Sequence, residues 1–360
     1  LLLPPPLGRR ARPPRQRACA WRGCAGSQAG LMGFLGGVCR CTLAAAVVPL
    51  AIVLAIFLEK PSVTQLDVSA LPADEGSAPA AAEAAAAKEL EFGTAVKEGF
   101  GSGGMFDRIA FVYDSTNKWM SLGLDQYWRK TMIQECMTLQ KGDRVLDLAT
   151  GTADVSLLAG TTLSKLSDGA LPADSVLGVD PSSEMLRRGV SKVDGQGLTG
   201  GVRLVKGDAQ DLTSVRGINA EGTLSDPSAG VASDSIDKIS IAFGIRNVPD
   251  RSLAFREMKR VLQKRRSSRV CILEFSLPSG ETFLSAVAKK FITHVIPFIG
   301  RVATMNSGST EYEYLERSIL KFPQPKDFAA EMARDGLTVN SITTFAFGAV
   351  NLYTASPAGV

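Results

Sequence analysis

The chain is almost without histidine, because His294 is the only one among its 360 residues. Histidine is the side chain that most often acts as an acid or base near neutral pH, and it is the commonest metal ligand. His294 lies in the apolar stretch "FITHVIPFIG", so we interpret it as a packed or substrate-channel residue. The sequence therefore predicts an active site without a histidine base.

Cysteine is scarce in the part of the chain that resembles a folded domain. Four of the six cysteines lie in the first 58 residues, and only Cys136 and Cys271 lie beyond them. No disulfide framework follows from this distribution. Cys39 and Cys41 form a lone C-x-C pair, which lacks the second ligand pair of a zinc site. We therefore predict no bound metal.

Acidic residues and lysine are absent from the first 58 residues, which contain seven arginines. Subtracting these seven from the 40 basic residues of the chain leaves 33 basic against 36 acidic residues, so the remainder carries about −3 instead of +4. Nucleic-acid-binding domains have a basic surface. The sequence therefore indicates no nucleic-acid partner.

Residues 41–58 form an apolar run of eighteen residues without a charge. This length is just enough for a transmembrane helix and is long for the apolar part of a signal peptide. If translation begins at Met32, the first methionine, the run belongs to a short signal or signal-anchor. If the longer form is made, its arginine-rich start resembles an organellar presequence before a membrane anchor. Both interpretations predict a leader over 1–58 and association with a membrane.

The composition changes after this leader. Residues 59–104 are rich in Ala, Pro, Gly and acids, which predicts a linker. From 105 to 360, apolar runs alternate with amphipathic segments, as in an α/β domain with a parallel sheet. A helix at 249–263 is expected to direct Leu253 toward the core together with Met258, Val261 and Leu262. The other predicted elements are strands at 144–149, 175–180, 202–208, 237–243 and 269–275, a helix at 182–193 and a polar, solvated loop at 217–235.

Polar residues follow three of the predicted strands. Thr150-Gly151-Thr152 follow the first strand, Asp180 ends the second and Asp208 ends the third. Ligands of open α/β sheets bind beyond the carboxyl ends of the strands, and an acid after the second strand usually accepts the protons of ribose hydroxyls. We therefore assign Asp180 to the ribose of a nucleotide-like cofactor.

The loop after the first strand lacks the glycines of a dinucleotide site. It reads "TGTADV" with one glycine, whereas a diphosphate site needs G-x-G-x-x-G. Asp147 in the strand and Asp154 at the start of the next helix would repel a diphosphate. S-adenosylmethionine has no phosphate and carries a sulfonium and an ammonium group, so these residues favour it over NAD. A nicotinamide-dependent oxidoreductase stays open as an alternative.

Longer motifs carry a specific resemblance. In this order the chain contains "FDRIAFVYDSTNKWMSLGLDQYWRK" (106–130), "VLDLATGTADVS" (145–156), "IAFGIRNVPDRSLAFREMKRVL" (241–262), "LEFSLP" (273–278) and "EYEYLERSILKFP" (311–323). Together they resemble the UbiE/MenG quinone-biosynthesis C-methyltransferases over about residues 100–355. The resemblance implies a class I, Rossmann-like methyltransferase of the α/β class, with a mostly parallel seven-stranded sheet and helices on both faces. It implies transfer of a methyl group from S-adenosylmethionine to a ring carbon of a prenylated quinol.

The resemblance also assigns roles to residues. Arg246 would stabilise the phenolate form of the substrate, although a salt bridge that closes its loop is the alternative. Asn247 and Tyr113 would orient the ring hydroxyls, and Asp114 and Asn117 would hold an N-terminal lid over the cofactor. The predicted cofactor contacts are Asp147, Gly151, Thr152, Asp180, Asp208, Ala209 and Ala242.

Several positions depart from the family's pattern. Ala153 replaces the second glycine of the cofactor loop, and Ala242 stands where serine is frequent, so a catalytically weak, membrane-tethered scaffold of a quinone-biosynthesis complex is a second hypothesis. "GLDQYWRK" lacks the family's usual histidine, and "LQKRRSSR" replaces the turn "LKPGG". The expected partners are the prenylated quinol, the membrane, and other quinone-biosynthesis enzymes or a second copy of the chain. A mitochondrial inner membrane is the favoured location, with a plastid as the alternative. The motifs do not decide between a benzoquinol and a naphthoquinol ring, although "GLDQYWRK" and the ending lean toward the menaquinone type.

Overall fold

The computed structural model describes residues 59–66, 103–121, 123–218, 224–227, 230–290, 292–293, 314 and 317–359, all within the compact unit Leu58–Val360. The predicted leader, its apolar run at 41–58 and the part of the linker from 67 to 102 lie outside these residues. Among the residues described, no helix is long and apolar enough to cross a membrane.

One sheet contains all the described strands, in the order β1-β9-β10-β8-β7-β2-β3-β4-β5-β6. The neighbouring strands in the run β8-β7-β2-β3-β4 pair in parallel. By contrast, β10 runs antiparallel to both β8 and β9. Of the seven central strands, six therefore share one direction and β10 is reversed, which confirms the predicted fold class. The strands are β1 (Ser62–Gln65), β2 (Val145–Leu148), β3 (Val176–Asp180), β4 (Val202–Asp208), β5 (Asp211–Ile218), β6 (Leu224–Pro227), β7 (Lys238–Ala242), β8 (Arg269–Phe275), β9 (Leu337–Phe345) and β10 (Val350–Pro357).

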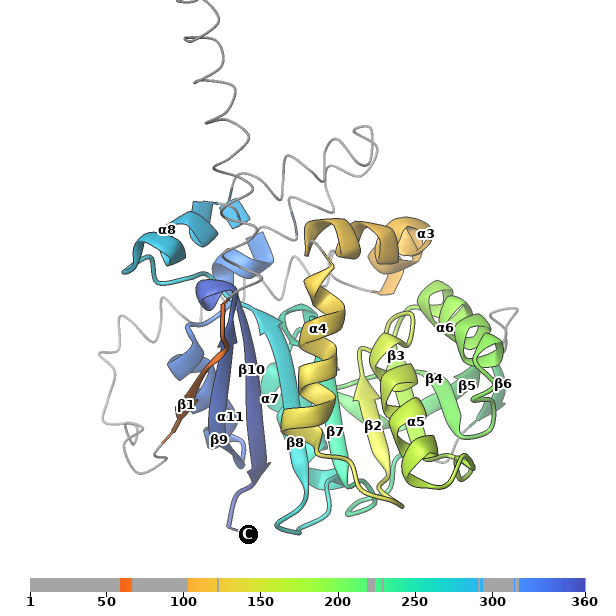
Figure 1. The fold of residues 1–360 in the computed structure, drawn as a ribbon. Coiled ribbons are helices and arrows are strands. Elements are labelled where there is room, and N and C mark those ends of the chain that lie inside the picture. Colours follow the sequence, from red (N-terminus) through yellow and green to blue (C-terminus); the bar gives the residue numbers. More distant parts are fainter. Residues whose placement is uncertain are drawn as a thin grey trace, which may run out of the picture. The chain divides into compact units, whose positions relative to one another are not determined.

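Helices cover both faces of this sheet. Figure 1 shows α4, α5 and α6 in front of it and α7 and α11 behind it, while α3 and α8 lie beyond its upper edge. On the rear face, Phe255 and Met258 of α7 and Phe328 of α11 pack with Leu146 and Ile239 of the sheet in one apolar core. The helices are α3 (Gly103–Met120), α4 (Leu124–Thr131), the π-helical η2 (Met132–Met137), α5 (Asp154–Leu166), α6 (Ser183–Gly195), the 3₁₀ turn η3 (Ile245–Asn247), α7 (Arg251–Val261), α8 (Phe283–Lys290), α11 (Pro325–Arg334) and the 3₁₀ turn η5 (Ala346–Gly348).

The five predicted strands match β2, β3, β4, β7 and β8 within one residue at each end. The helices predicted at 182–193 and 249–263 match α6 and α7 within two residues, because their caps are encoded locally. Ser182 accepts a hydrogen bond from the Met185 backbone N–H, and Asp250 accepts one from the Leu253 N–H. Such side-chain caps satisfy amide groups that have no partner within the helix.

Three expectations about these regions were wrong. Residues 62–65, expected in the linker, form β1 and pair with β9 at the edge of the sheet. The expected solvated loop at 217–235 contains the end of β5 and the strand β6, which pair with each other. Leu253 is 43% exposed and does not face the core, whereas Met258, Val261 and Leu262 are fully buried. The buried stripe of α7 consists of Ala254, Phe255, Met258 and Val261, and Leu253 lies beside it on the solvent side of the helix.

A disulfide joins Cys136 of η2 to Cys271 of β8, and their Cα atoms are 5.9 Å apart. The sequence analysis did not predict this bond, because the two residues are 135 positions apart and no cysteine pattern connects them. Both side chains are buried in the core. The bond ties the segment after α4 to a central strand.

We expect a reducing agent to lower the free energy of unfolding. A crosslink across so long a segment lowers the conformational entropy of the unfolded chain, which stabilises the folded protein by up to about 4 kcal/mol. Denaturant titrations of the wild-type protein with and without reductant would measure the difference. A Cys136→Ala/Cys271→Ala variant should show no effect of reductant, and this controls for the four cysteines of the leader. Two free thiols from these positions in the unfolded, unreduced protein would contradict the bond.

Candidate active site

A cavity of about 230 Å³ opens at the carboxyl ends of β2, β3, β4 and β7. Its walls come from the segments that follow these strands and from the first turn of α3. Asp180 and Asp208 are its only titratable lining residues among those that the structure describes. The lining residues are Gly103, Phe106, Ala149, Gly151, Val179, Asp180, Pro181, Met185, Gly207, Asp208, Ala209, Ala242, Phe243, Gly244, Asn247, Val248 and Pro249.

The predicted site residues fall into two groups. Those that line the cavity are Gly151, Asp180, Asp208, Ala209, Ala242 and Asn247. Asp147, Thr152 and Arg246 are buried close to its walls but do not line it. Tyr113 belongs to α3, and its side chain lies outside the described part of the structure. The structure thus brings six of the predicted residues together at one cavity, and their roles stay predictions.

Asp147 holds the loop that follows β2 through hydrogen bonds to its carboxylate. Its Oδ2 accepts hydrogen bonds from the hydroxyls of Thr150 (2.6 Å) and Ser156 (2.8 Å), and its Oδ1 accepts one from Ser240 (2.8 Å). Burial raises the pKa of this carboxyl, and the three hydroxyl donors act in the opposite direction. Asp147 does not line the cavity in this structure: its carboxylate accepts three hydrogen bonds from the chain itself and fixes the loop that follows β2.

That loop has an unusual backbone. Ala149, Gly151 and Ala153 all have positive φ angles, of 48°, 56° and 69°. A Cβ on Gly151 would meet nothing within 4 Å, so the space in front of this residue is open to a ligand. The Ala153 side chain instead points toward α6, because a Cβ on Gly189 would lie 3.2 Å from it. Ala153 therefore costs about 1 kcal/mol of backbone strain but leaves the cavity unobstructed.

Asp180 presents a carboxylate at the end of β3. Its Oδ2 accepts the Gly151 backbone N–H and its Oδ1 accepts the Ser182 backbone N–H, both at 2.8 Å. Each oxygen can accept a further hydrogen bond. Burial raises the pKa of Asp180 to about 6, and the two backbone donors oppose this rise. Asp180 is therefore held in place by backbone groups and offers its free lone pairs to the cavity.

Arg246 belongs to the segment that follows β7 and forms a buried ion pair with Glu274. Its Nη1 donates to Glu274 Oε1 at 2.6 Å and to the Phe243 carbonyl at 2.7 Å. Its backbone N–H donates to Glu274 Oε2 at 3.2 Å. Arg246 is 6% exposed and Glu274 is fully buried. This geometry corresponds to the salt bridge that was the alternative for Arg246, and its guanidinium faces Glu274 instead of the open cavity.

Asn247 is the predicted catalytic residue that reaches the cavity. The Tyr314 hydroxyl donates to Asn247 Oδ1 at 3.2 Å, so the Asn247 amide group NH₂ is left to donate elsewhere. Burial raises the pKa of Tyr314 to about 12, while nearby Arg246 acts to lower it and Glu274 acts to raise it further. Tyr314 therefore remains a protonated donor over the whole physiological range.

Phe243 also carries backbone strain, with a φ of 59° that bulky residues rarely adopt. Its ring lies 4.6 Å from that of Phe275 and packs against Trp128. The Arg129 guanidinium lies over the same ring at 5.3 Å. Strained residues of this kind cluster at functional sites because the surrounding packing must hold them.

The strand order, the reversed β10 and the position of the cavity together are those of the class I, Rossmann-like methyltransferase fold. The chain belongs to the ubiE/COQ5 methyltransferase family, whose model matches residues 94–356. It is therefore an S-adenosylmethionine-dependent C-methyltransferase, as the sequence motifs implied.

Relatives of the chain are found among bacterial proteins. It is 35% identical over 251 residues to the ubiquinone/menaquinone biosynthesis C-methyltransferase UbiE of Geotalea daltonii, which covers 69% of this chain and 93% of that protein. It is 31% identical over 253 residues to the protein of the same name from Campylobacter jejuni, covering 70% and 95% of the two chains. A solved S-adenosylmethionine-dependent methyltransferase from Aquifex aeolicus is 14% identical, covers 64% of this chain and 90% of its own, and has a TM-score of 0.42.

The residues present fit S-adenosylmethionine. The Asp180 carboxylate has lone pairs for ribose hydroxyls, Gly151 leaves open space beside it, and Ala209 and Ala242 add small apolar surface suited to a purine ring. Asp208 is held by its own turn, since both its oxygens accept the Gln210 amide at 3.0 and 2.9 Å. These residues would hold the cofactor, which supplies an electrophilic methyl group when bound.

One step of the sequence argument for this cofactor is not supported. Asp154 was expected to repel a diphosphate, but its carboxylate is paired with Lys192 at 3.0 Å and approaches Arg129 at 3.9 Å. Asp147 is buried below the loop. The predicted cofactor is confirmed by the family match. The carboxylates of Asp147 and Asp154, which were the argument for it, instead bind other groups of the chain.

Four residues of this region were missed as functional residues. Glu274, Tyr314 and Arg129 belong to the motifs "LEFSLP", "EYEYLERS" and "WRK", so the motifs were a signal for them. Lys192 on α6 has no such signal, because nothing in its neighbourhood distinguishes it from a solvated helical lysine.

We expect the affinity for S-adenosylmethionine to fall as the pH is lowered through about 6. The pKa of Asp180 is raised to about 6, so its carboxylate becomes protonated below that pH and accepts fewer hydrogen bonds. The dissociation constant should rise by up to about tenfold for each pH unit below 6. Calorimetric titrations between pH 5 and 8 would measure it.

Asp180→Asn is the matched control, because it keeps the shape but cannot titrate. It should bind more weakly at pH 7.5 and show no step near pH 6. A wild-type dissociation constant that stays the same from pH 7.5 to pH 5 would rule out this role for Asp180.

Proposed function

We propose that the chain methylates a ring carbon of a prenylated quinol in ubiquinone or menaquinone biosynthesis. One observation carries this proposal: the motif segment 242–249 supplies six of the residues that line the cofactor cavity, namely Ala242, Phe243, Gly244, Asn247, Val248 and Pro249. The motif "FGIRNV", one of those that carry the resemblance to the quinone enzymes, is thus part of the cavity wall. The names of the bacterial relatives support the same substrate class.

A quinol ring carbon becomes nucleophilic when a neighbouring hydroxyl ionises. Asn247 can donate its amide N–H to that oxygen, because Tyr314 occupies its carbonyl side. Oriented donors of this kind stabilise negative charge at low reorganisation cost. Arg246 contributes indirectly, since its contacts with the Phe243 carbonyl and Glu274 hold the segment that carries Asn247. Phe243 provides an aromatic wall for the ring.

The scaffold alternative depended on Ala153 and Ala242. Ala153 points away from the cavity, and Ala242 enlarges it at one wall without closing it. Neither substitution therefore gives a physical reason for lost activity.

We further propose that the reaction takes place at an organellar membrane, with the mitochondrial inner membrane favoured and a plastid as the alternative. The apolar run at 41–58 and the lipid solubility of a prenylated quinol support this location. Other quinone-biosynthesis enzymes and a second copy of the chain are the proposed protein partners.

Expression in a bacterium that makes both ubiquinone and menaquinone and lacks its own enzyme tests the substrate. We expect at least one quinone to return, and mass spectrometry of both shows which ring is accepted. An Asn247→Ala variant expressed at the same level should restore less. If the protein accumulates and binds S-adenosylmethionine but neither quinone returns, the proposed substrate is wrong.

Tyr314→Phe should lower kcat roughly tenfold, because loss of one positioning hydrogen bond removes about 1 to 1.5 kcal/mol. The dissociation constant for S-adenosylmethionine should stay within about twofold, since Tyr314 acts on Asn247 and not on the cofactor residues. Tyr127→Phe, on the exposed side of α4, is the control. Wild-type kcat and KM for the quinol in Tyr314→Phe would contradict the role of this hydroxyl.

A further inference from the structure

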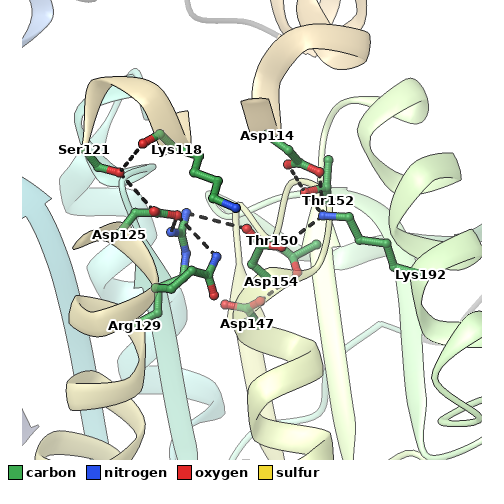
Figure 2. Close-up of polar contacts among 11 residues, drawn as sticks. Asp114, Lys118, Ser121, Asp125, Arg129, Asp147, Thr150, Thr152, Asp154 and Lys192 are labelled. Carbon is green, nitrogen blue, oxygen red and sulfur yellow. Dashed lines mark hydrogen bonds and ion pairs between the residues drawn. The ribbon is translucent and has the colours of Figure 1, made fainter. Parts of the chain in front are cut away.

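Lys192 joins four elements through one ammonium group. From α6, its Nζ contacts Asp114 Oδ2 on α3 at 2.6 Å, Thr152 Oγ1 on the cofactor loop at 2.8 Å and Asp154 Oδ1 at the start of α5 at 3.0 Å. Thr152 also donates to Asp114 Oδ1 at 2.7 Å (Figure 2). The ammonium, which has three N–H donors, thus forms hydrogen bonds with Thr152 and Asp154 and an ion pair with Asp114. No other standard side chain supplies three donors from one atom.

We infer that Lys192 is a positioning residue for the cofactor site: its ammonium holds α3 against the cofactor loop and so keeps two walls of the cavity together. Lys192 does not line the cavity itself. One wall includes Gly151 of the cofactor loop, which is next to Thr152. The other wall consists of Gly103 and Phe106 of α3. Lys192 therefore acts on the cofactor through residues that it binds on both walls.

The face of α3 that meets the loop is visible in its sequence spacing. Gly103, Asp107, Ala110 and Asp114 follow each other at four, three and four residues, which places them on one side of a helix. Asp107 Oδ1 accepts the Ser182 hydroxyl at 2.5 Å and the Glu184 backbone N–H at 2.9 Å. A Cβ on Gly103 would lie 2.7 Å from the Pro181 carbonyl oxygen. The first half of α3 is thus fixed to α6 by Asp107, and its second half is fixed by Lys192.

Arg129 of α4 supports the same cluster from the other side. It pairs with Asp125 at 2.6 Å and approaches Asp154 at 3.9 Å, as Figure 2 shows. Asp154 therefore lies between two cations. Without Lys192, the carboxylates of Asp114 and Asp154 would face each other across the loop without the cation between them, and like charges repel. Loss of Lys192 would then separate α3 from the loop.

The effect on cofactor binding depends on how often α3 lies against the cofactor loop. If, without the ammonium, α3 lies there for about one tenth of the time, the apparent dissociation constant for S-adenosylmethionine rises about tenfold. The catalytic groups around Asn247 belong to a different wall. The loss should therefore affect cofactor affinity more than kcat at saturating S-adenosylmethionine.

The test is Lys192→Met in the full chain, with S-adenosylmethionine and S-adenosylhomocysteine as probes. We expect both dissociation constants to rise about tenfold, hydrogen exchange to become faster in residues 103–114, and kcat at saturation to stay within about threefold. Lys192→Arg keeps the charge but spreads its donors over a planar group, so it should restore part of the affinity.

Two variants separate the contact from its charge. Arg187→Met removes one positive charge from the same helix, where Arg187 pairs with the half-exposed Glu184 at 2.8 Å, and it should bind like the wild type. Asp114→Asn/Lys192→Met keeps the net charge of the wild type and removes the repulsion between the two carboxylates, but it also lacks the contact, so it should bind more weakly than the wild type and no more weakly than Lys192→Met. If Lys192→Met does not fold, Asp114→Asn alone tests the same contact.

Dissociation constants within twofold of the wild type in Lys192→Met and Asp114→Asn would overturn the inference. So would a fall in kcat with unchanged affinity and unchanged hydrogen exchange of α3. The inference rests only on the cofactor part of the proposed function. If no quinone is methylated while the cofactor still binds, the substrate proposal fails and the Lys192 test still stands.

Discussion

The carboxylate of Asp147 on β2 is buried and accepts hydrogen bonds from hydroxyls that belong to the cofactor loop, to α5 and to β7. Burying a carboxylate without partners would cost several kcal/mol, so these hydroxyls are needed to keep it there. Ser240 and Gly178 are its register neighbours on the two adjacent parallel strands. A Cβ on Gly178 would lie 2.9 Å from the hydroxyls of both Thr150 and Ser156. The position of the loop, the start of α5 and the glycine in β3 therefore all depend on this one carboxylate.

Two buried carboxylates at the same edge of the sheet thus have different roles. Asp147 accepts side-chain hydroxyls and does not line the cavity, whereas Asp180 accepts the backbone N–H groups of Gly151 and Ser182 and lines it. Asp147 also contributes to the raised pKa of Asp180, although burial is the larger cause. Asp147, which holds the site together, thus accepts hydroxyl groups. Asp180, which faces the ligand, accepts backbone N–H groups.

The five parallel central strands and the place of the cavity could be predicted from local signals, whereas the seven-stranded fold with β9 and β10 was implied only by the family resemblance. Apolar runs locate the central strands, and the carboxyl end of each strand locates a lining residue such as Asp180 or Asp208. The contacts that hold the walls could not be predicted in this way. Lys192 meets Thr152 across 40 residues, Arg246 meets Glu274 across 28, and Cys136 meets Cys271 across 135. These pairs form only after the sheet is assembled, and no periodicity records them. The edge strand β1 was missed for the same reason, since only its register with β9 makes it a strand.

The chemistry of the cavity follows from what its described lining offers. Asp180 and Asp208 are its only titratable groups, and both belong to the cofactor side. Tyr314 has a pKa of about 12, and the charge of Arg246 is compensated by Glu274 at 2.6 Å. Tyr314 is therefore no base near neutral pH, and Asp180, with its pKa of about 6, lies on the cofactor side of the cavity. For the proposed ring methylation, the described residues therefore contribute through orientation: Asn247 directs a donor at the ring oxygen and Phe243 confines the ring. Holding two reactants in line in this way can supply about 7 kcal/mol or more of the barrier reduction, which explains why strain at Phe243 and a buried ion pair are retained to fix one short segment.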